Sequence, residues 1–501
     1  MKTTKRYLSI SLAFVIAVIL SQAVAERSYK RGVSQNNFTY PEEVTALTPG
    51  VCWHYNWGIT PNNTVADVEG PGTDMEFVPM IWGGTFNEEG LRTYLTEHPG
   101  VKYLLGFNEP NFKAQANMTP QVAAEIWPKV EAIAKDFDLK LVGPALNYSP
   151  DAPYQNPTTW YDEFFELYPD ARVDFLALHC YMLASDGMMN FINSIADRYG
   201  KQIWLTEFCA WDGLTREEAD ARKIQRDEMV RKVEALELSP NVYRYSWFMA
   251  KGADNYPYYS LLKYKNVNQG IEAGTLTDLG KIYVNMSVFD TTHYYKPDVV
   301  FAATNYVKST LLSVNVSTDE ASEFPLQVEG FSNMRTLEYL IDVPTAGEYR
   351  LYARVSTAGI PVTAYINGEA VGTATWETTG EQGEWDTRYI NMTLPAGQHR
   401  LQLKGTKLSR YCDISTIVFR NTAGVENLGV DRQELRVVKQ AGNIYLQGCG
   451  NVVSYELYAA DGALLTSGAG NVVEAGAYNA GFYIIRVTNT DNKTYCCKII
   501  L

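Results

Sequence analysis

The amino-terminal part of the chain alternates short apolar runs with longer segments whose apolar residues recur at helical spacing. A helix is predicted over residues 120–137, where Thr119 is a suitable N-cap and Pro120 suits the first turn, and a charge-rich helix over residues 215–236. Strands that alternate with helices form parallel sheets. The pattern therefore predicts an α/β fold, a (β/α)8 TIM barrel. The eight predicted strands cover residues 31–34, 51–57, 77–82, 103–107, 139–143, 174–179, 203–207 and 243–247.

The pattern changes near residue 297, where short alternating strands follow one another with Gly and Pro turns and without long helices. This arrangement is typical of a β-sandwich. The last segment has further short strands and predicts a small all-β domain. We therefore expect a barrel over residues 26–296, a β-sandwich over 297–422 and a carboxyl-terminal β domain over 423–501. The clearest sandwich strands are residues 337–343, 349–355, 362–367, 388–394 and 399–404.

Residues 1–25 have the pattern of a secretory signal peptide. Lys2, Lys5 and Arg6 form a positive region, residues 8–20 are apolar, and residues 23–25 (Ala-Val-Ala) suit cleavage. A membrane anchor is the alternative, but the apolar run is short for a span. The predicted location is secreted or at the cell surface.

The formal net charge of −14 over 501 residues disfavours nucleic acid and anionic membranes as partners, because both attract basic patches. The 34 Tyr, 19 Phe and 10 Trp fit either large cores or a carbohydrate-binding surface. Cys52, Cys180 and Cys209 lie in or beside predicted strands, so buried free thiols are expected. No metal or catalytic cofactor is predicted, since the adjacent Cys496 and Cys497 lack zinc-ligand spacing. A monomer is expected.

Two glutamates stand at the ends of predicted strands four and seven. Glu109 follows residues 103–107 and precedes Pro110, which stops the strand, and Glu207 ends residues 203–207. Because the carboxyl ends of barrel strands share one rim, these carboxylates can face each other. Such a pair cleaves glycosidic bonds, with a separation of about 5–5.5 Å in retaining enzymes and about 9 Å in inverting ones. The structural alternatives are a helix-capping Glu109 and an ion-paired Glu207.

Aromatic and amide side chains occupy other predicted strand ends. Indole rings stack on the apolar faces of sugars, although each could equally belong to the core. The candidate sugar contacts at this rim are Trp57, Trp82, Trp211, Trp247, Asn56, Asn111 and Asn147.

The order of motifs resembles glycoside hydrolase family 128, in the clan of retaining (β/α)8 glycosidases. The resemblance implies an endo-β-1,3-glucanase in which Glu109 is the acid/base and Glu207 the nucleophile. It also implies that Asn108 reaches the sugar 2-hydroxyl and that Tyr181 orients the nucleophile. His179 shares a strand face with Tyr181, where a packed or hydrogen-bonded histidine is expected. The motifs are residues 51–57, 77–83, 105–111, 141–145, 174–181, 204–208 and 244–248.

Residues 346–351 and 394–399 resemble carbohydrate-binding modules of family 6. Trp376 and Trp385 are then candidates for an accessory sugar platform, with plain core or strand roles as the alternative. Some modules of this type hold a structural calcium, which the resemblance allows here. The last segment resembles the C-terminal sorting domain of the type IX secretion route, which implies the secretion machinery as a partner. A further sugar-binding sandwich is the alternative.

The expected function is hydrolysis of β-1,3-glucan, with a polysaccharide or oligosaccharide as partner. One alternative is a glycosidase of the same clan that acts on mannan, xylan or β-1,4-glucan. The other alternative is an exported glycan-binding protein without catalysis. The presence of a glutamate at each of the two strand-end motifs disfavours it.

Overall fold

The computed structural model describes residues 27–211, 216–253, 255–310, 312–406 and 410–422, with shorter segments beyond. The expected signal peptide, residues 1–25, lies outside the described part. The chain divides into two compact units, one that ends at Arg420 and one that begins at Asn421. The described segments after residue 422 are 436–440, 443–447, 451–459, 463–474, 478, 481–490 and 494–500.

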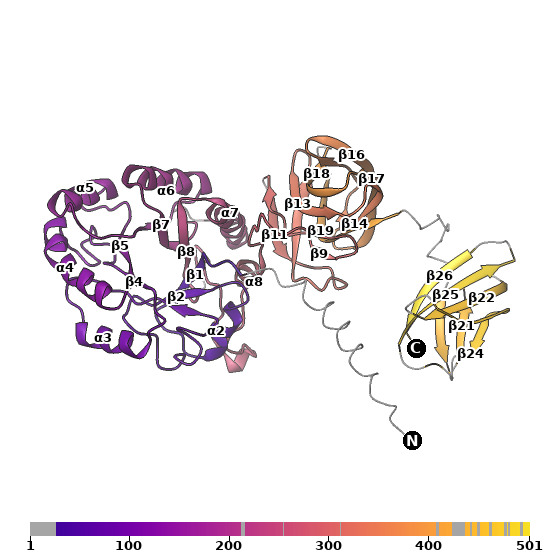
Figure 1. Cartoon of the computed structure of the whole chain (residues 1–501), viewed down its shortest axis with the longest axis horizontal. Helices are drawn as coiled ribbons and strands as arrows, with labels where there is room; N and C mark the ends of the chain where they lie inside the picture. Colours follow the sequence, from indigo (N-terminus) through magenta and orange to yellow (C-terminus); the bar gives the residue numbers. More distant parts are fainter. Residues whose placement is uncertain are drawn as a thin grey trace, which may run out of the picture. The chain divides into compact units, whose positions relative to one another are not determined.

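An eight-stranded sheet forms the centre of the first domain, and its strands run in the order β3-β2-β1-β8-β7-β6-β5-β4 (Figure 1). All of its strand pairs are parallel. A parallel bridge between Met80 and Leu105 joins the two ends of this order. The predicted TIM-like domain of eight parallel strands is confirmed. Its strands are β1 Arg31–Ser34, β2 Trp53–Tyr55, β3 Glu76–Phe77, β4 Tyr103–Leu105, β5 Lys140–Leu146, β6 Phe175–Cys180, β7 Ile203–Phe208 and β8 Val242–Phe248.

Helices surround this sheet on its outer side (Figure 1). The helix α4 begins where the sequence predicts, because the Thr119 side chain accepts a hydrogen bond from the Val122 amide and Pro120 occupies the first turn. The helix α7 begins at Glu218, and residues 212–215 before it lie outside the described part. The helices are α2 Pro41–Leu47, α3 Glu88–Glu97, α4 Pro120–Asp136, α5 Pro157–Leu167, α6 Ser185–Tyr199, α7 Glu218–Leu238 and α8 Asp278–Asn285, with a short 3₁₀ helix over Val267–Gln269.

Aromatic side chains fill the interior of the sheet near the amino ends of its strands. Trp53 and Trp204 are fully buried there, and Tyr103 and Tyr243 pack on the Trp204 indole. The Arg244 guanidinium lies over the Tyr103 ring at 4.8 Å and pairs with Glu76 at 2.7 Å. This packed layer leaves the carboxyl ends of the strands as the place for a site.

A β-sandwich follows, with the sheet orders β10-β13-β18-β15-β16 and β11-β12-β19-β14-β17. The barrel and this sandwich together form the first compact unit. The strands are β9 Phe301–Ala302, β10 Lys308–Ser309, β11 Ser313–Val316, β12 Leu326–Ser332, β13 Thr336–Val343, β14 Gly347–Thr357, β15 Ile360–Ile366, β16 Glu369–Trp376, β17 Asp386–Leu394, β18 Gly397–Gly405 and β19 Tyr411–Asn421.

The second unit is all-β in its described residues, as predicted, and has the sheet orders β20-β21-β24 and β23-β22-β25-β26. Its core contains Ile444, Leu457 and Ile485. The strands are β20 Arg436–Gln440, β21 Asn443–Gln447, β22 Val452–Ala459, β23 Leu464–Gly468, β24 Val472–Glu474, β25 Phe482–Asn489 and β26 Thr494–Ile500.

The described cysteines are free thiols, which confirms the prediction for Cys180 and Cys209; both are buried, whereas Cys52 is partly exposed. Among the described residues, no helix combines the length and the apolar character that a bilayer crossing requires.

Candidate active site

The end of β4 places Glu109 at the rim of the barrel. The Asn108 amide donates to the Trp82 carbonyl at 2.8 Å, and the Glu109 amide donates to the Ala145 carbonyl at 2.9 Å. Glu109 has a φ of 44°, in the left-handed region that side chains other than Gly adopt rarely. Backbone bonds to both neighbouring strands therefore hold the residue in a fixed, strained position.

Glu207 lies at the end of β7, and three side chains donate hydrogen bonds to its carboxylate. The Trp57 indole and the Tyr55 hydroxyl donate to Oε1 at 2.8 and 3.3 Å. The Tyr181 hydroxyl donates to Oε2. Burial and the charge of Glu207 raise the pKa of both tyrosines well above 10, so each keeps its proton as a donor. These three donors therefore hold the Glu207 carboxylate in place.

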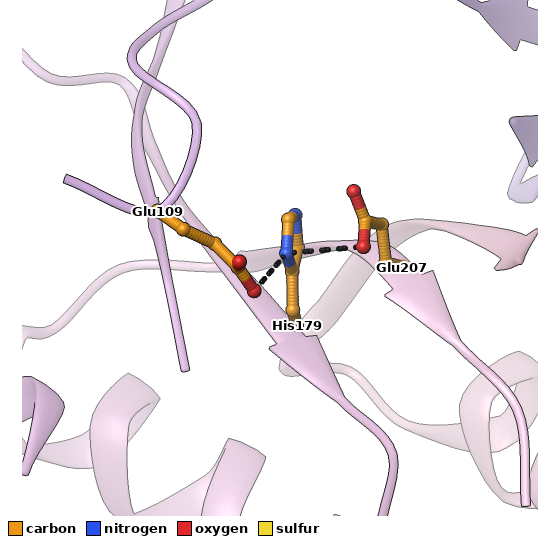
Figure 2. A group of neighbouring side chains, drawn as sticks. All are labelled: Glu109, His179 and Glu207. Atoms are coloured by element: carbon orange, nitrogen blue, oxygen red, sulfur yellow. Dashed lines mark hydrogen bonds and ion pairs between the residues drawn. The ribbon is translucent and has the colours of Figure 1, made fainter. Parts of the chain in front are cut away.

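His179 of β6 lies between the two glutamates (Figure 2). Its Nδ1 is 2.8 Å from Glu109 Oε1 and 3.3 Å from Glu207 Oε2. Burial lowers the pKa of His179, but the charges of Glu207 and Glu109 and the hydrogen bond to Glu109 outweigh it, so the pKa lies above 6.5. One carboxylate oxygen of Glu109 and one of Glu207 lie within 4.8 Å of each other. That distance suits a retaining pair better than the roughly 6.5–9.5 Å of an inverting pair.

The two glutamates line a cleft of about 520 Å³. Of the predicted contacts, Trp57, Trp82, Asn108, Asn147 and Tyr181 line it. Trp82 is 39% exposed and thus offers a free ring face. The buried Asn108 Oδ1 has no hydrogen-bond partner among the described residues. The other lining residues are Asn36, Phe112, Gln115, Tyr148, Phe248 and Met249.

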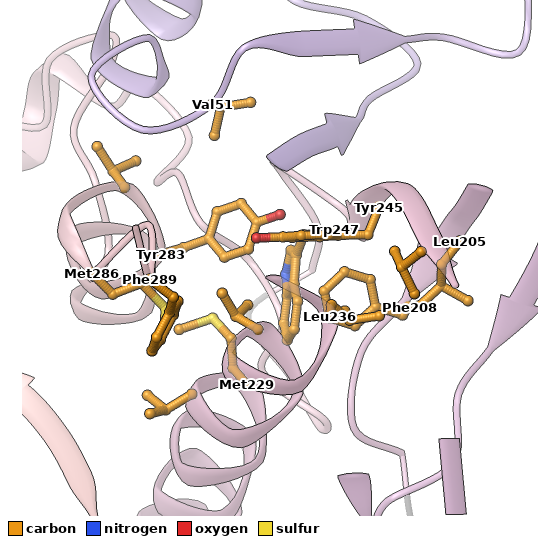
Figure 3. Close-up of a cluster of buried hydrophobic side chains, with 14 of the residues drawn as sticks. Val51, Leu205, Phe208, Met229, Leu236, Tyr245, Trp247, Tyr283, Met286 and Phe289 are labelled. Carbon is orange, nitrogen blue, oxygen red and sulfur yellow. The ribbon is translucent and has the colours of Figure 1, made fainter. Parts of the chain in front are cut away.

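Trp247 was expected at the barrel mouth, and the structure corrects this. It is 0% exposed and packs among Phe208, Tyr245 and Tyr283 on the outer side of the sheet (Figure 3). Its indole N–H donates to the Tyr259 carbonyl at 2.8 Å. The alternation of β8 turns this side chain toward the helix layer, away from the cleft.

Three further candidates contact protein rather than the cleft. Asn56 accepts a hydrogen bond from the Gly58 amide and donates to the Thr60 carbonyl, so it shapes the loop after β2. Asn111 is buried and donates to the Asn147 carbonyl at 2.7 Å, which joins the loops after β4 and β5. Trp211 is 43% exposed and lies edge-on to Tyr181, with 6.3 Å between ring centroids, outside the residues that line the cleft.

In the sandwich, the structure also corrects the prediction that Trp376 belongs to a sugar platform. Trp376 is 0% exposed and belongs to the core. Trp385 is partly exposed, and its indole N–H donates to the Thr318 hydroxyl at 3.1 Å. Trp385 therefore remains the one tryptophan of the predicted pair that a sugar could reach.

The sequence reasoning missed Tyr55, Gln115, Tyr148 and Phe248. Tyr55 donates to Glu207, and the Gln115 side-chain oxygen accepts from Nδ2 of Asn108 at 3.4 Å. Strand alternation gives Tyr55 the same inward face as Trp57, a signal that could have identified it. Gln115, Tyr148 and Phe248 lie in loops or at a strand end, where sequence patterns do not indicate direction.

The two glutamates and His179 also lie close enough together to hold a metal ion. Among the described residues, this is the group of three or more His, Cys, Asp or Glu side chains that could do so. The described part of the sandwich has no such group. The structural calcium there stays a prediction, and backbone carbonyls would have to supply many of its ligands.

The sequence is similar to known carbohydrate-active proteins over both the barrel and the sandwich. Residues 303–421 match the model of carbohydrate binding module family 6. Alkali-sensitive linkage protein 1 of Schizosaccharomyces pombe (strain 972 / ATCC 24843) is 27% identical over 254 residues, which are 48% of this chain and 41% of that protein. The chain thus spans less than half of that relative's length.

Two solved structures of glycoside hydrolase family 128 (subgroup II) endo-β-1,3-glucanases are also similar. That from Pseudomonas viridiflava is 36% identical, covers 52% of this chain and 98% of its own, and has a TM-score of 0.47. That from Sorangium cellulosum is 31% identical, covers 51% and 97%, and has a TM-score of 0.44. Residues 32–283, about half of the chain, match the model of the glycosyl hydrolase catalytic core, and the chain therefore belongs to that family and is a glycoside hydrolase.

Proposed function

We propose that this protein is a secreted, retaining endo-β-1,3-glucanase that works by double displacement. The observation that carries the proposal is the Glu109–Glu207 pair, with carboxylate oxygens within 4.8 Å at the wall of one cleft. A sugar carbon between the two groups could be attacked by one of them while the other protonates the leaving oxygen.

Glu207 is the nucleophile in this mechanism, because Trp57, Tyr55 and Tyr181 all donate to its carboxylate and hold it at the wall of the cleft. Glu207 attacks the anomeric carbon, and Glu109 transfers its proton to the departing glycosidic oxygen. The covalent glycosyl-enzyme is then hydrolysed by a water molecule from which Glu109 takes a proton. Each cycle returns both glutamates to their starting forms.

The place of Asn108 in the cleft lining, with its Oδ1 unpartnered among the described residues, supports a contact with the sugar 2-hydroxyl. The exposed Trp82 ring supports a stacked sugar in the cleft. β-1,3-Glucan is the proposed polymer because the ordered strand-end motifs resemble family 128. The 36% sequence identity with the Pseudomonas viridiflava endo-β-1,3-glucanase agrees with this choice.

The test is incubation of the purified protein with linear β-1,3-glucan, β-1,4-glucan, xylan and mannan. We expect short oligosaccharides from the β-1,3-glucan alone, and NMR should show products that first appear as the β-anomer. An α-anomer as first product would contradict retention, and release from xylan instead would contradict the substrate.

Variants at the two glutamates test their roles. Glu207→Gln and Glu109→Gln should each lower kcat by about 10³-fold or more, because each removes a group from the bond-breaking step. Glu89→Gln is the matched control, an exposed glutamate in the first turn of α3. Full activity in Glu207→Gln would refute its assignment as nucleophile.

Export and sugar binding outside the barrel belong to the same proposal. We assign export to residues 1–25 and to the last domain as a type IX sorting signal, and accessory glucan binding to the sandwich with Trp385. Detection of the protein in the culture medium, and its loss on deletion of residues 423–501, tests the route. Affinity electrophoresis of Trp385→Ala in a β-1,3-glucan gel tests the module.

A further inference from the structure

Lys232 of α7 is a fully buried lysine behind the active site. Its ammonium donates to the Met182 carbonyl and, at 2.7 Å, to the Cys209 carbonyl. Met182 follows Tyr181, and Cys209 lies two residues after Glu207. Tyr181 and Glu207 are hydrogen-bonded to each other. Lys232 thus links the backbone segment just after Tyr181 to the segment just after Glu207.

Gln225 lies two turns earlier on the same helix and is 1% exposed. Its side-chain oxygen accepts from the Ala210 amide at 2.8 Å, and its nitrogen donates to the Ala210 carbonyl at 2.9 Å. The same nitrogen donates to the Pro257 carbonyl at 2.9 Å. Gln225 therefore fixes the segment after Glu207 and ties it to the loop after β8.

These contacts extend a direct link between the two loops, in which the Trp211 amide donates to the Tyr181 carbonyl at 3.0 Å. The pairing of β6 with β7 sets Cys180 opposite Phe208. Beyond that point, Lys232, Gln225 and the backbone bond from Trp211 hold the segments that follow Tyr181 and Glu207.

A buried ammonium is costly, and Lys232 forms no ion pair with a described carboxylate within 4.0 Å. Burial lowers its pKa, against smaller opposite effects of Cys180, Cys209 and Glu228. Core packing alone would be served better by Leu or Met at this place. What an ammonium adds is donors that can bind carbonyls of two separate loops at once.

We propose that Lys232 and Gln225 are positioning residues that align Tyr181 with the carboxylate of Glu207. The inference rests on the proposed role of Glu207 as nucleophile and deepens it. Neither side chain lines the cleft, and both act through the backbone of residues 182 and 209–210.

The test is a double-mutant cycle with Lys232→Met and Tyr181→Phe. In the wild-type chain, Lys232→Met should lower kcat on β-1,3-glucan by about 10²-fold, because small misplacements of reacting groups cost that much. KM should change by less than about threefold, since the cleft wall is intact. In the Tyr181→Phe chain, the same substitution should cost less than about tenfold, because the bond it aligns is already lost.

Val233→Ala is the matched control, a buried apolar neighbour on α7 that carries no polar group. It should lower the thermal midpoint but leave kcat unchanged in both chains. If Lys232→Met does not fold, Gln225→Met in the same cycle decides, with the same non-additive result expected. Equal losses in both chains, or no loss, would overturn the inference.

The two proposals fail in different ways. A wild-type protein without β-1,3-glucanase activity, or an active Glu207→Gln, contradicts the proposed function and the inference with it. An active wild type with an inactive Glu207→Gln, together with additive effects of Lys232→Met and Tyr181→Phe, contradicts the inference alone.

Discussion

Three donors meet at the carboxylate of Glu207, and no comparable set meets Glu109 among the described residues. Trp57, Tyr55 and Tyr181 donate hydrogen bonds to Glu207, whereas Glu109 is hydrogen-bonded to Nδ1 of His179. At the scale of single residues, this difference in hydrogen-bond partners supports the proposed assignment of Glu207 as nucleophile and Glu109 as acid.

Tyr55→Phe should lower kcat/KM by about tenfold, because it removes one hydrogen bond to a charged group. The ring stays in place, so the barrel interior keeps its packing. Steady-state kinetics on β-1,3-glucan measures the effect. Tyr283→Phe is the control, since this buried hydroxyl donates to the Gly32 carbonyl, remote from both glutamates. Equal losses in the two variants would contradict a direct role of Tyr55.

The stabilisation that His179 contributes should decrease as the pH rises. Its pKa is raised in the folded state, so the stabilisation is fully present below the unfolded value near 6.5 and is lost as the pH rises through the folded value. The thermal midpoint of the wild type should exceed that of His179→Gln by more at about pH 6 than at about pH 9. A gap that widens toward alkaline pH would contradict the raised pKa.

At the scale of elements, strand ends supply the reacting groups and helices supply their supports. The helix α7 serves both barrel and sandwich, because Lys232 and Gln225 face the active-site loops while Glu234 contacts the sandwich. The helix α4 begins at a cap that local sequence determines, and it can be tested separately from the site.

Thr119→Ala should lower the free energy of unfolding by about 1 kcal/mol, because the Val122 amide at the start of α4 loses its acceptor. Urea denaturation of the full chain measures this loss. Thr93→Ala is the comparison, an exposed threonine within α3 whose hydroxyl donates to the Glu89 carbonyl. If both variants lose the same amount, the cap has no special role.

At the scale of the molecule, barrel and sandwich form one compact unit. Glu234 of α7 accepts hydrogen bonds from the Ser309 amide at 2.9 Å and hydroxyl at 2.8 Å, and Arg226 pairs with Glu329 at 2.7 Å. Burial raises the pKa of Glu234 although both Ser309 bonds lower it. The junction therefore includes a partly buried carboxylate that accepts two hydrogen bonds from Ser309.

Ser309→Ala should destabilise this unit by about 1–2 kcal/mol, because it removes one of the two Ser309 donors to a partly buried carboxylate. Calorimetry of the full chain should show a lower midpoint for the barrel–sandwich transition. Thr310→Ala, whose exposed hydroxyl pairs with Thr336, should have a much smaller effect. An unchanged midpoint in Ser309→Ala would show that the junction does not rely on Glu234.

The sequence by itself determined the elements and the placement of the two glutamates. Apolar runs, Thr119 and Pro110 are local signals, and their physical causes act within a few residues. Glu109 and Glu207 were predictable because parallel strands bring every carboxyl end to one rim, whatever the details of packing.

Tertiary structure alone decided which side chains face the cleft and which face the core. Trp247 and Trp376, like Trp82, are tryptophans at or near the end of a strand in the sequence. The first two are nevertheless covered by packed side chains, whereas Trp82 is exposed. The partners of Glu207, and the reach of Lys232 to two loops, join residues far apart along the chain. Burial and long-range hydrogen bonds depend on what the rest of the chain places opposite a residue, and sequence spacing does not contain that information.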